Sequence, residues 1–210
     1  FKLPPGFKAE VWATGMPGAR AMARAENGKL YIGTRGIGRV YEVTDNGSAR
    51  SSRVVVDKLV QPAGVAYAKG RPCWLEGTVS DATGQPLAGA LVEIWQCDAE
   101  GHYRHPGDGD RADPAFQAFG RVLADAAGRY RFRTMRPVAY GGRTPHIHVK
   151  VKLGRRTLLT TQLYVDGDPG NARDFLWRAL QDPADRAALT VPFRPVADGL
   201  HAEFHIVVAA

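Results

Sequence analysis

Residues 139–153 read "AYGGRTPHIHVKVKL", and the last eight residues of this stretch alternate between polar and apolar side chains. In an extended strand, successive side chains point to opposite faces. The apolar row, which predicts a face buried in a core, holds Ile147, Val149, Val151 and Leu153. The other row holds His146, His148, Lys150 and Lys152. Burial explains the first row but does not explain two neighbouring histidines on the second.

The same alternation recurs along most of the chain, where 24 glycines and 14 prolines separate short apolar stretches. Such spacing is typical of strands joined by turns. It predicts strands near residues 8–13, 29–34, 38–44, 52–56, 74–80, 90–96, 119–124, 129–134, 146–153, 157–165 and 202–208. One helix is expected over 171–181, with Asn171 as its N-cap, and a short helical piece over 183–189. We therefore expect an all-β protein built as an antiparallel β-sandwich with one short helix.

The composition limits the classes of partner. With 210 residues, of which 44% are hydrophobic, the chain can bury a sizeable core. No apolar stretch approaches the roughly 20 residues of a membrane span, so no membrane partner is expected. The net charge of +7 comes from scattered basic residues, which does not favour nucleic acid as a partner. The charge is explained equally well by solubility or by a mild attraction for anionic ligands.

Two cysteines, Cys73 and Cys97, are too few for a disulfide scaffold or a cysteine-rich zinc site. We expect two free thiols, although the two residues flank a predicted hairpin and could face each other. No leader sequence is visible and the chain begins with Phe1. The compartment therefore stays open between the cytoplasm and a periplasmic or secreted location.

The N-terminal third has its own motifs, "LPPGF", "ENGKLYIGTR", "GRVYEV" and "LVQPAGVAY", within residues 3–67. They resemble the opening blade of a quinoprotein sugar-dehydrogenase type of β-propeller. A propeller closes with about four to eight blades, so one blade implies no dehydrogenase activity. We expect residues 1–70 to form a partial propeller-like β segment, either a packing accessory or, since an open sheet exposes edges and an apolar face, a contact that makes a homo-oligomer.

After a boundary near "AKGRP" (68–72), residues 75–103 read "LEGTVSDATGQPLAGALVEIWQCDAEGHY". This is a strand, a turn, a second strand and a glycine bend that presents Tyr103. The stretch resembles the intradiol ring-cleavage dioxygenases, relatives of protocatechuate 3,4-dioxygenase and catechol 1,2-dioxygenase. The pieces "GRVLADAAGRYRFRTMRP", "AYGGRTPHIH", "TQLYVDGDP" and "AEFHIVV" follow in the family's order, so the resemblance covers 74–210. It implies that residues 71–210 are a catalytic domain with the family's transthyretin-like sandwich.

The candidate metal site consists of Tyr103, Tyr140, His146 and His148. Imidazoles at positions i and i+2 on one strand face can reach one metal ion. Two phenolates are hard anionic donors that favour Fe(III), whereas non-haem Fe(II) oxygenases use two histidines and a carboxylate. No acidic residue lies between Tyr140 and Leu153, which argues against that alternative. The histidines not expected to be ligands are His102, His105, His201 and His205.

The family resemblance assigns roles to these residues around a non-haem Fe(III) ion. It implies that Tyr140 and His146 are axial ligands and that Tyr103 and His148 are equatorial. It also implies that Tyr140 leaves the metal when a catechol binds and takes up a proton as a base. The implied reaction uses O2 to cleave the catechol between its two hydroxyl-bearing carbons, giving a cis,cis-muconate-type diacid.

Three further residues have expected roles near the reacting atoms. Arg143 would stabilise negative charge that develops on the substrate, since a fixed guanidinium suits an oxyanion. Gln162 is expected to hydrogen-bond Arg143 or to line the oxygen pocket. Trp95 is expected in the core or the pocket wall.

Only "GGRTP" separates Tyr140 from His146, which is shorter than in the well-known members of the family. We expect an open pocket and broad tolerance of substituted catechols. The alternative is a non-catalytic, transthyretin-like binding module that keeps the metal site without turnover.

Overall fold

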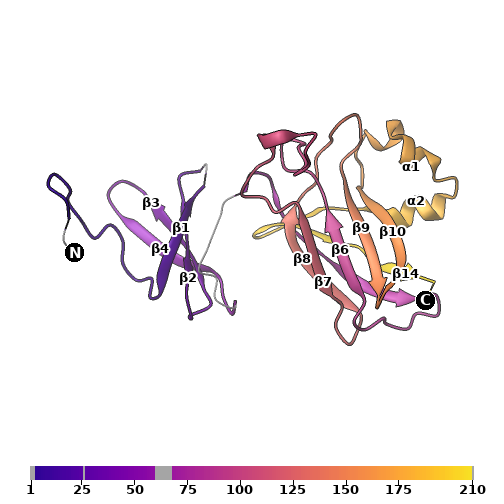
Figure 1. The fold of residues 1–210 in the computed structure, drawn as a ribbon, viewed down its shortest axis with the longest axis horizontal. Coiled ribbons are helices and arrows are strands. Elements are labelled where there is room, and N and C mark those ends of the chain that lie inside the picture. The colour runs from indigo at the N-terminus through magenta and orange to yellow at the C-terminus, as the bar shows by residue number, and fades with distance from the viewer. Residues whose placement is uncertain (1–2, 26, 60–67, 210) are drawn as a thin grey trace. The chain divides into compact units, whose positions relative to one another are not determined.

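The computed structural model describes residues 3–25, 27–59 and 68–209. The chain divides into two compact units, residues 1–67 and 68–210 (Figure 1). The sequence placed the boundary at 70–71, close to this division. Within the described residues, no helix is long and apolar enough to cross a membrane.

The N-terminal unit contains one antiparallel sheet in which sequential strands are neighbours. Its strands are β1 (Ala19–Arg24), β2 (Leu30–Thr34), β3 (Val40–Asp45) and β4 (Arg50–Val56). The buried core is small and consists of Ile32, Tyr41 and Val43. Most of "LVQPAGVAY", the predicted start of a second blade, lies outside the described residues.

The predicted strand over 8–13 is wrong, because these residues form no strand, and the sequence missed β1. In the described part of the chain, no strand pairs with the alternating stretch "KAEVWA". Ala13 and Met16 instead pack against the small core from outside the sheet. β1 is rich in alanine and arginine, and its pairing with β2 decides its conformation.

The C-terminal unit is the predicted β-sandwich (Figure 1). One sheet has the order β11 (Thr190–Val191), β10 (Arg156–Val165), β9 (His146–Leu153), β6 (Leu91–Trp95) and β7 (Phe119–Leu123). The other has β12 (Arg194–Val196), β13 (Gly199–Glu203), β5 (Pro72–Asp81) and β14 (Ile206–Val208), with β8 (Arg129–Met135) paired to β5. Most pairs are antiparallel, but β13 and β14 both run parallel to β5, and β11 runs parallel to β10.

The apolar row of β9 lies in the core of this unit, as the sequence predicts. Ile147, Val149 and Val151 are fully buried, whereas Leu153 at the end of the strand is 37% exposed. They pack with buried residues of both sheets, which include Leu75, Val79, Val92, Ile94, Leu163, Leu200 and Ile206. The histidine row therefore lies on the opposite face of its sheet.

Two details of the predicted elements differ from the structure. The strand expected over 202–208 is interrupted at Phe204 and His205, so β13 and β14 are separate. The helix expected over 171–181 is a 3-10 turn, η2 (Asn171–Arg173), followed by α1 (Phe175–Ala179). The N-cap assignment to Asn171 is wrong, because the Asp174 side chain accepts from the first backbone amides of α1. The second helical piece is α2 (Pro183–Leu189), and a further 3-10 turn, η1 (Gly109–Arg111), lies in the loop after Tyr103.

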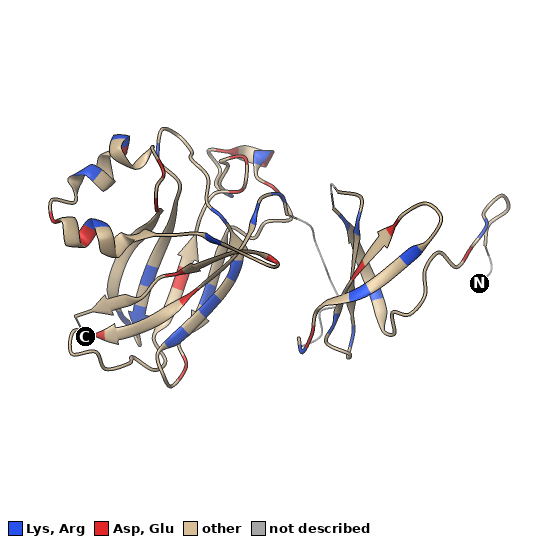
Figure 2. Ribbon diagram, turned by 180° about the vertical axis from the view of Figure 1, so that it is seen from behind, with Lys and Arg blue, Asp and Glu red and all other residues tan. Residues whose placement is uncertain are grey.

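Basic and acidic residues both occur along each of the two units (Figure 2). Two arginines of β8 form ion pairs with acidic residues, Arg131 with Glu76 and Arg133 with Asp198.

Cys73 and Cys97 are both buried, and both are free thiols, as predicted.

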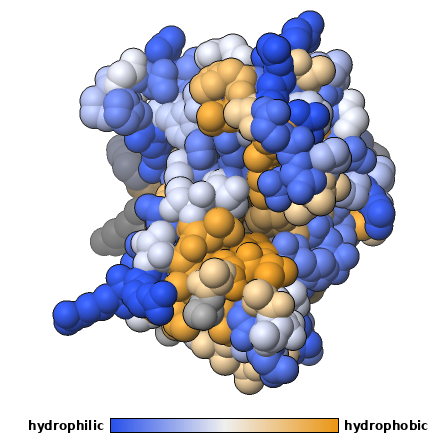
Figure 3. All heavy atoms as spheres, turned by 90° about the vertical axis from the view of Figure 1, so that its right-hand side faces the viewer, coloured by the Kyte–Doolittle hydropathy of each residue, from blue (hydrophilic) through white to orange (hydrophobic). Residues whose placement is uncertain are grey.

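One face of the C-terminal unit leaves apolar surface uncovered among hydrophilic neighbours. Figure 3 shows this patch on the side that bears α1, α2 and the C-terminal end. The exposed large apolar residues of the unit include Phe175 and Val207, which are 65% and 62% exposed.

Gly77 in the middle of β5 generates a prediction about stability. A Cβ atom there would collide with the carbonyl of Phe204, which also accepts a hydrogen bond from the buried Tyr130 hydroxyl. We expect Gly77→Ala to lower the free energy of unfolding by about 3 kcal/mol, since the strand must shift. Ser80→Ala on the same strand should change it by less than about 0.5 kcal/mol. Equal urea midpoints for the two variants would contradict the prediction.

Candidate metal centre

Four aromatic rings from three segments of the C-terminal unit lie together. His146 and His148 come from β9, and their ring centroids are 4.7 Å apart. Tyr140 lies 5.4 Å from His146 and 4.8 Å from Tyr103. Tyr103 completes the group at 6.4 Å from His148. The structure thus brings together all four residues that the sequence predicts as ligands.

A tight turn sets Tyr140 opposite Arg143. The backbone amide of Arg143 donates to the Tyr140 carbonyl at 2.7 Å, and the reverse bond is 3.2 Å long. Gly141 and Gly142 between them have positive φ of 50° and 80°. Residues that carry a Cβ atom rarely adopt a positive φ at two successive positions, which explains the pair of glycines.

The main chain fixes the tautomer of one of the two histidines, His146. Nδ1 of His146 lies 2.6 Å from the Thr144 carbonyl, so it donates its proton there. The other nitrogen, Nε2, then carries a lone pair and lies within hydrogen-bond distance of Nε2 of His148, at 3.2 Å. Burial lowers the pKa of His146, and burial with the nearby His146 and Arg143 lowers the pKa of His148 to about 4. Both rings are therefore neutral near pH 7, as metal ligands must be.

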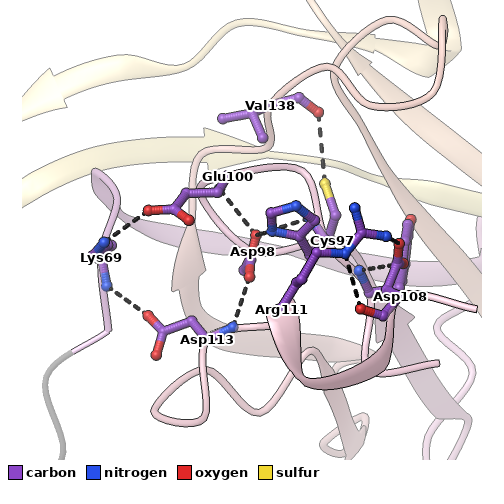
Figure 4. A network of polar contacts seen from close by, with 10 residues as sticks. Lys69, Cys97, Asp98, Glu100, Asp108, Arg111, Asp113 and Val138 are labelled. Carbon is purple, nitrogen blue, oxygen red and sulfur yellow. Dashed lines mark hydrogen bonds and ion pairs between the residues drawn. The ribbon is translucent and has the colours of Figure 1, made fainter. Parts of the chain in front are cut away.

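Tyr103 is presented by a loop with its own polar network (Figure 4). The buried carboxylate of Asp98 accepts from the backbone amides of Glu100, His102 and Asp113 at 2.9, 2.9 and 2.7 Å. Asp108 accepts from the backbone amide of Tyr103 at 3.0 Å. Two carboxylates thus hold the backbone on both sides of the tyrosine.

The Tyr103 hydroxyl itself is buried and has no hydrogen-bond partner among the described residues. Burial, with the phenol of Tyr140 close by, raises the pKa of Tyr103 above its usual range. An unpaired buried hydroxyl is costly unless something else binds it. A cation bound between the rings would satisfy this oxygen and favour its ionised form.

The sheet places two further side chains on either side of His148. Trp95 on β6 and Gln162 on β10 are both its register partners. The Trp95 ring stacks on the His148 ring with centroids 4.8 Å apart and planes within 4°. Trp95 therefore forms a wall of the site, and it fixes the plane of one imidazole.

Arg143 is held beside the rings by two partners. Its Nε donates to Asp174 at 2.6 Å, and its Nη2 donates to Gln162 at 2.9 Å. The predicted hydrogen bond between Arg143 and Gln162 is present. Only 12% of the Arg143 side chain is exposed, so its charge acts in a partly desolvated setting.

The sequence missed Asp174 and Thr144. Asp174 lies just before α1 and accepts from Arg143 and from the backbone amide of Thr144. Thr144 also donates from its hydroxyl to Asn171 at 2.8 Å. The position of Asp174 directly before the apolar "FLW" is a sequence signal for an N-cap. Its contacts with Arg143 and Thr144 have no local signal, because these residues lie about 30 positions earlier in the chain.

The other histidines lie elsewhere or make other contacts. His201 pairs with Glu76 at 2.8 Å, and His205 with the Thr78 hydroxyl at 3.0 Å.

A cavity of about 430 Å³ opens beside Trp95 between β7 and β8, and none of the four rings lines it.

The donor set fits a trivalent iron better than a zinc or Fe(II) site. Among the described residues, no group of three His, Cys, Asp or Glu side chains could hold a metal. Any metal bound by His146 and His148 would need the tyrosine oxygens as further donors. Phenolate and imidazole together suit a hard, highly charged cation.

Comparison with known proteins agrees with this geometry. The family described as "Dioxygenase" matches residues 52–190, more than half of the chain. Hydroxyquinol 1,2-dioxygenase of Rhodococcus opacus is 32% identical over 169 residues, which cover 68% of this chain and 55% of the relative. The β chain of protocatechuate 3,4-dioxygenase of Burkholderia cepacia is 38% identical over 147 residues, covering 63% and 62%.

A solved structure is also similar. The dioxygenase domain of a dioxygenase–carbohydrate-binding fusion from Streptomyces sp. SirexAA-E has a TM-score of 0.56 and 35% identity, covering 68% of this chain and 82% of that domain. The β-sandwich of the C-terminal unit is thus similar to the fold of a dioxygenase domain. The chain belongs to the intradiol ring-cleaving dioxygenase family.

The matches have limits that bear on function. The chain spans 55% and 62% of the length of the two curated relatives. The family match begins within β4 of the N-terminal unit and ends at Thr190, whereas the motifs indicated 74–210. The comparisons give no support for the propeller resemblance of residues 3–67.

Proposed function

We propose that this chain is a non-haem Fe(III) intradiol dioxygenase with broad tolerance of substituted catechols. Its reaction would consume O2 and cleave the ring between the two hydroxyl-bearing carbons. The observation that supports this most is the cluster of Tyr103, Tyr140, His146 and His148, in which the buried Tyr103 hydroxyl has no hydrogen-bond partner within the described part of the chain. Relatives of the chain are named catechol, hydroxyquinol and protocatechuate dioxygenases.

These four residues would hold the iron. When bound, the iron would supply a Lewis acid that binds the catechol oxygens and makes the electron-rich ring reactive toward O2. The lone pair at Nε2 of His146 and the unpaired hydroxyl of Tyr103 are suitable donors.

The protein's own residues would handle protons and charge. The Tyr140 phenolic oxygen accepts a proton from a catechol hydroxyl, since a phenolate is basic enough for this transfer. The Arg143 guanidinium stabilises negative charge on the substrate oxygens, and its fixed hydrogen bonds avoid reorganisation during the reaction. Trp95 covers one face of His148 and keeps water from that side.

The ligand assignment predicts the behaviour of single variants. We expect Tyr103→Phe, His146→Ala and His148→Ala each to lower iron content several-fold and to bleach the visible tyrosinate band, because each loses a metal donor. Tyr140→Phe should keep part of the iron but slow turnover through lost proton transfer. His205→Ala is the matched control, because this histidine lies between β13 and β14 of the other sheet and contacts the Thr78 hydroxyl. Full iron and activity in both ligand-histidine variants would contradict the assignment.

The position of ring cleavage tests the proposed function directly. Catechol and ¹⁸O2 should give a cis,cis-muconate-type diacid with both labelled oxygen atoms, as seen by mass spectrometry. A yellow semialdehyde would show cleavage beside the diol, and the proposal would then be wrong.

We also infer that residues 1–70 make the protein a homo-oligomer. This inference is supported by the exposed apolar side chains of the N-terminal unit, such as Val11, Phe7 and Met22, which are 83%, 72% and 65% exposed. Soluble proteins seldom leave such surface uncovered.

Mass measurement in solution tests the oligomer. The full chain should be a multimer, and a chain that begins at Arg71 should have a lower oligomeric state. Iron content and activity of the shorter chain serve as controls for its folding. The same state for both chains would exclude residues 1–70 as the oligomer contact.

A further inference from the structure

The buried carboxylate of Asp174 has more partners than any helix cap requires. Only 1% of the residue is exposed. Its Oδ1 accepts from the backbone amides of Leu176 and Trp177 at 3.0 Å each. Its Oδ2 accepts from Arg143 Nε at 2.6 Å and from the Thr144 amide at 3.1 Å. Burial of a charge is costly unless hydrogen bonds compensate it, and here both oxygens are paired.

The two carboxylate oxygens of Asp174 bind different groups. Oδ1 caps α1, although Arg143 Nη2 also approaches it at 3.4 Å. Among the described residues, Oδ2 accepts only from Arg143 and Thr144, which lie in the turn that leads into β9. A cap needs a single acceptor, and asparagine or serine supplies it as well as aspartate does. Capping therefore does not account for the second oxygen or for the charge.

Through its hydrogen bonds to the turn before β9, Oδ2 positions two groups of the metal centre. One is the guanidinium of Arg143, whose Nη2 also reaches Gln162 at 2.9 Å. The other is the main chain of Thr144, whose carbonyl accepts the Nδ1 proton of His146 at 2.6 Å. The same carboxylate oxygen thus constrains the residue that would stabilise substrate charge and the one that fixes the histidine tautomer.

We infer that Asp174 is a positioning residue of the metal centre, which orients Arg143 directly and His146 through Thr144. This inference rests on the proposed function for its effect on turnover, but its effect on metal affinity does not require turnover. Burial raises the pKa of Asp174, but hydrogen bonds from Arg143, Trp177 and Thr144 outweigh it and hold the pKa below its usual value. The carboxylate is therefore charged near pH 7.

The chain contains a matched control for capping. Asp182 caps α2 by accepting from the Ala184 amide at 2.8 Å, and the residue is exposed. Asp174→Asn keeps a capping oxygen but turns an NH2 group toward two donors, Arg143 Nε and the Thr144 amide. Asp182→Asn makes the same chemical change with no contact to the site. Asp174→Ser is a second variant, which caps α1 without a second oxygen.

The experiment compares these variants as iron-loaded full-length protein. The measurements are the melting temperature, the iron retained against a fixed concentration of chelator, the visible band, and kcat and KM for catechol. Asp182→Asn should match the wild type, with a melting temperature within about 2 °C. Asp174→Asn and Asp174→Ser should lower kcat at least tenfold with KM within threefold, retain less iron and shift the visible band. In an Arg143→Gln background, Asp174→Asn should lower kcat little further but still weaken iron retention.

Several results would overturn the inference. One is an Asp174→Asn protein with wild-type kcat, iron retention and visible band. Another is a lower melting temperature alone, which would make Asp174 only a helix cap. Failure of both Asp174 variants to fold, beside a normal Asp182→Asn, would assign the residue to the fold instead of the site. If the wild type consumes no O2 with any catechol, the proposed function fails, and unchanged or weakened iron retention still decides the role of Asp174.

Discussion

Strand β9 is paired on both sides, with β6 and with β10, and its register determines which row of side chains faces the core. A shift by one residue would point the histidines into the apolar core between the sheets and turn Ile147, Val149 and Val151 to the opposite face. The three fully buried apolar residues therefore hold His146 and His148 on the outer face. The same pairing sets Trp95 and Gln162 on either side of His148.

The rest of the centre depends on loops that the sheet alone does not fix. Carboxylates that accept hydrogen bonds from the backbone hold these loops, and two of them, Asp98 and Asp174, are buried. Asp98 and Asp108 bind the backbone around Tyr103, and Asp174 binds the turn after Tyr140. Each carboxylate accepts from backbone amides or from an arginine, and such hydrogen-bonded networks rigidify the loops that carry the site.

The sequence predicted the sandwich from local signals, such as the alternation in "HIHVKVKL", and it predicted the four rings from that alternation together with the ordered family motifs. It missed Asp174, whose partners lie about 30 residues away and come close only in the folded chain. It misplaced the first strand, because the alternation over 8–13 says nothing about whether a partner strand exists. The helix near 175 was expected, but its cap was assigned to Asn171, whose side chain binds the Val165 carbonyl instead.

The central claim is that the paired tyrosines and histidines form an Fe(III) centre that cleaves catechols. Recording the visible spectrum while oxygen uptake is followed on a small panel of catechols tests it most directly. The account predicts a coloured protein whose band shifts when catechol is added and which consumes O2 in proportion to the catechol. A coloured protein that binds catechol without consuming O2 would contradict the account and indicate a binding module.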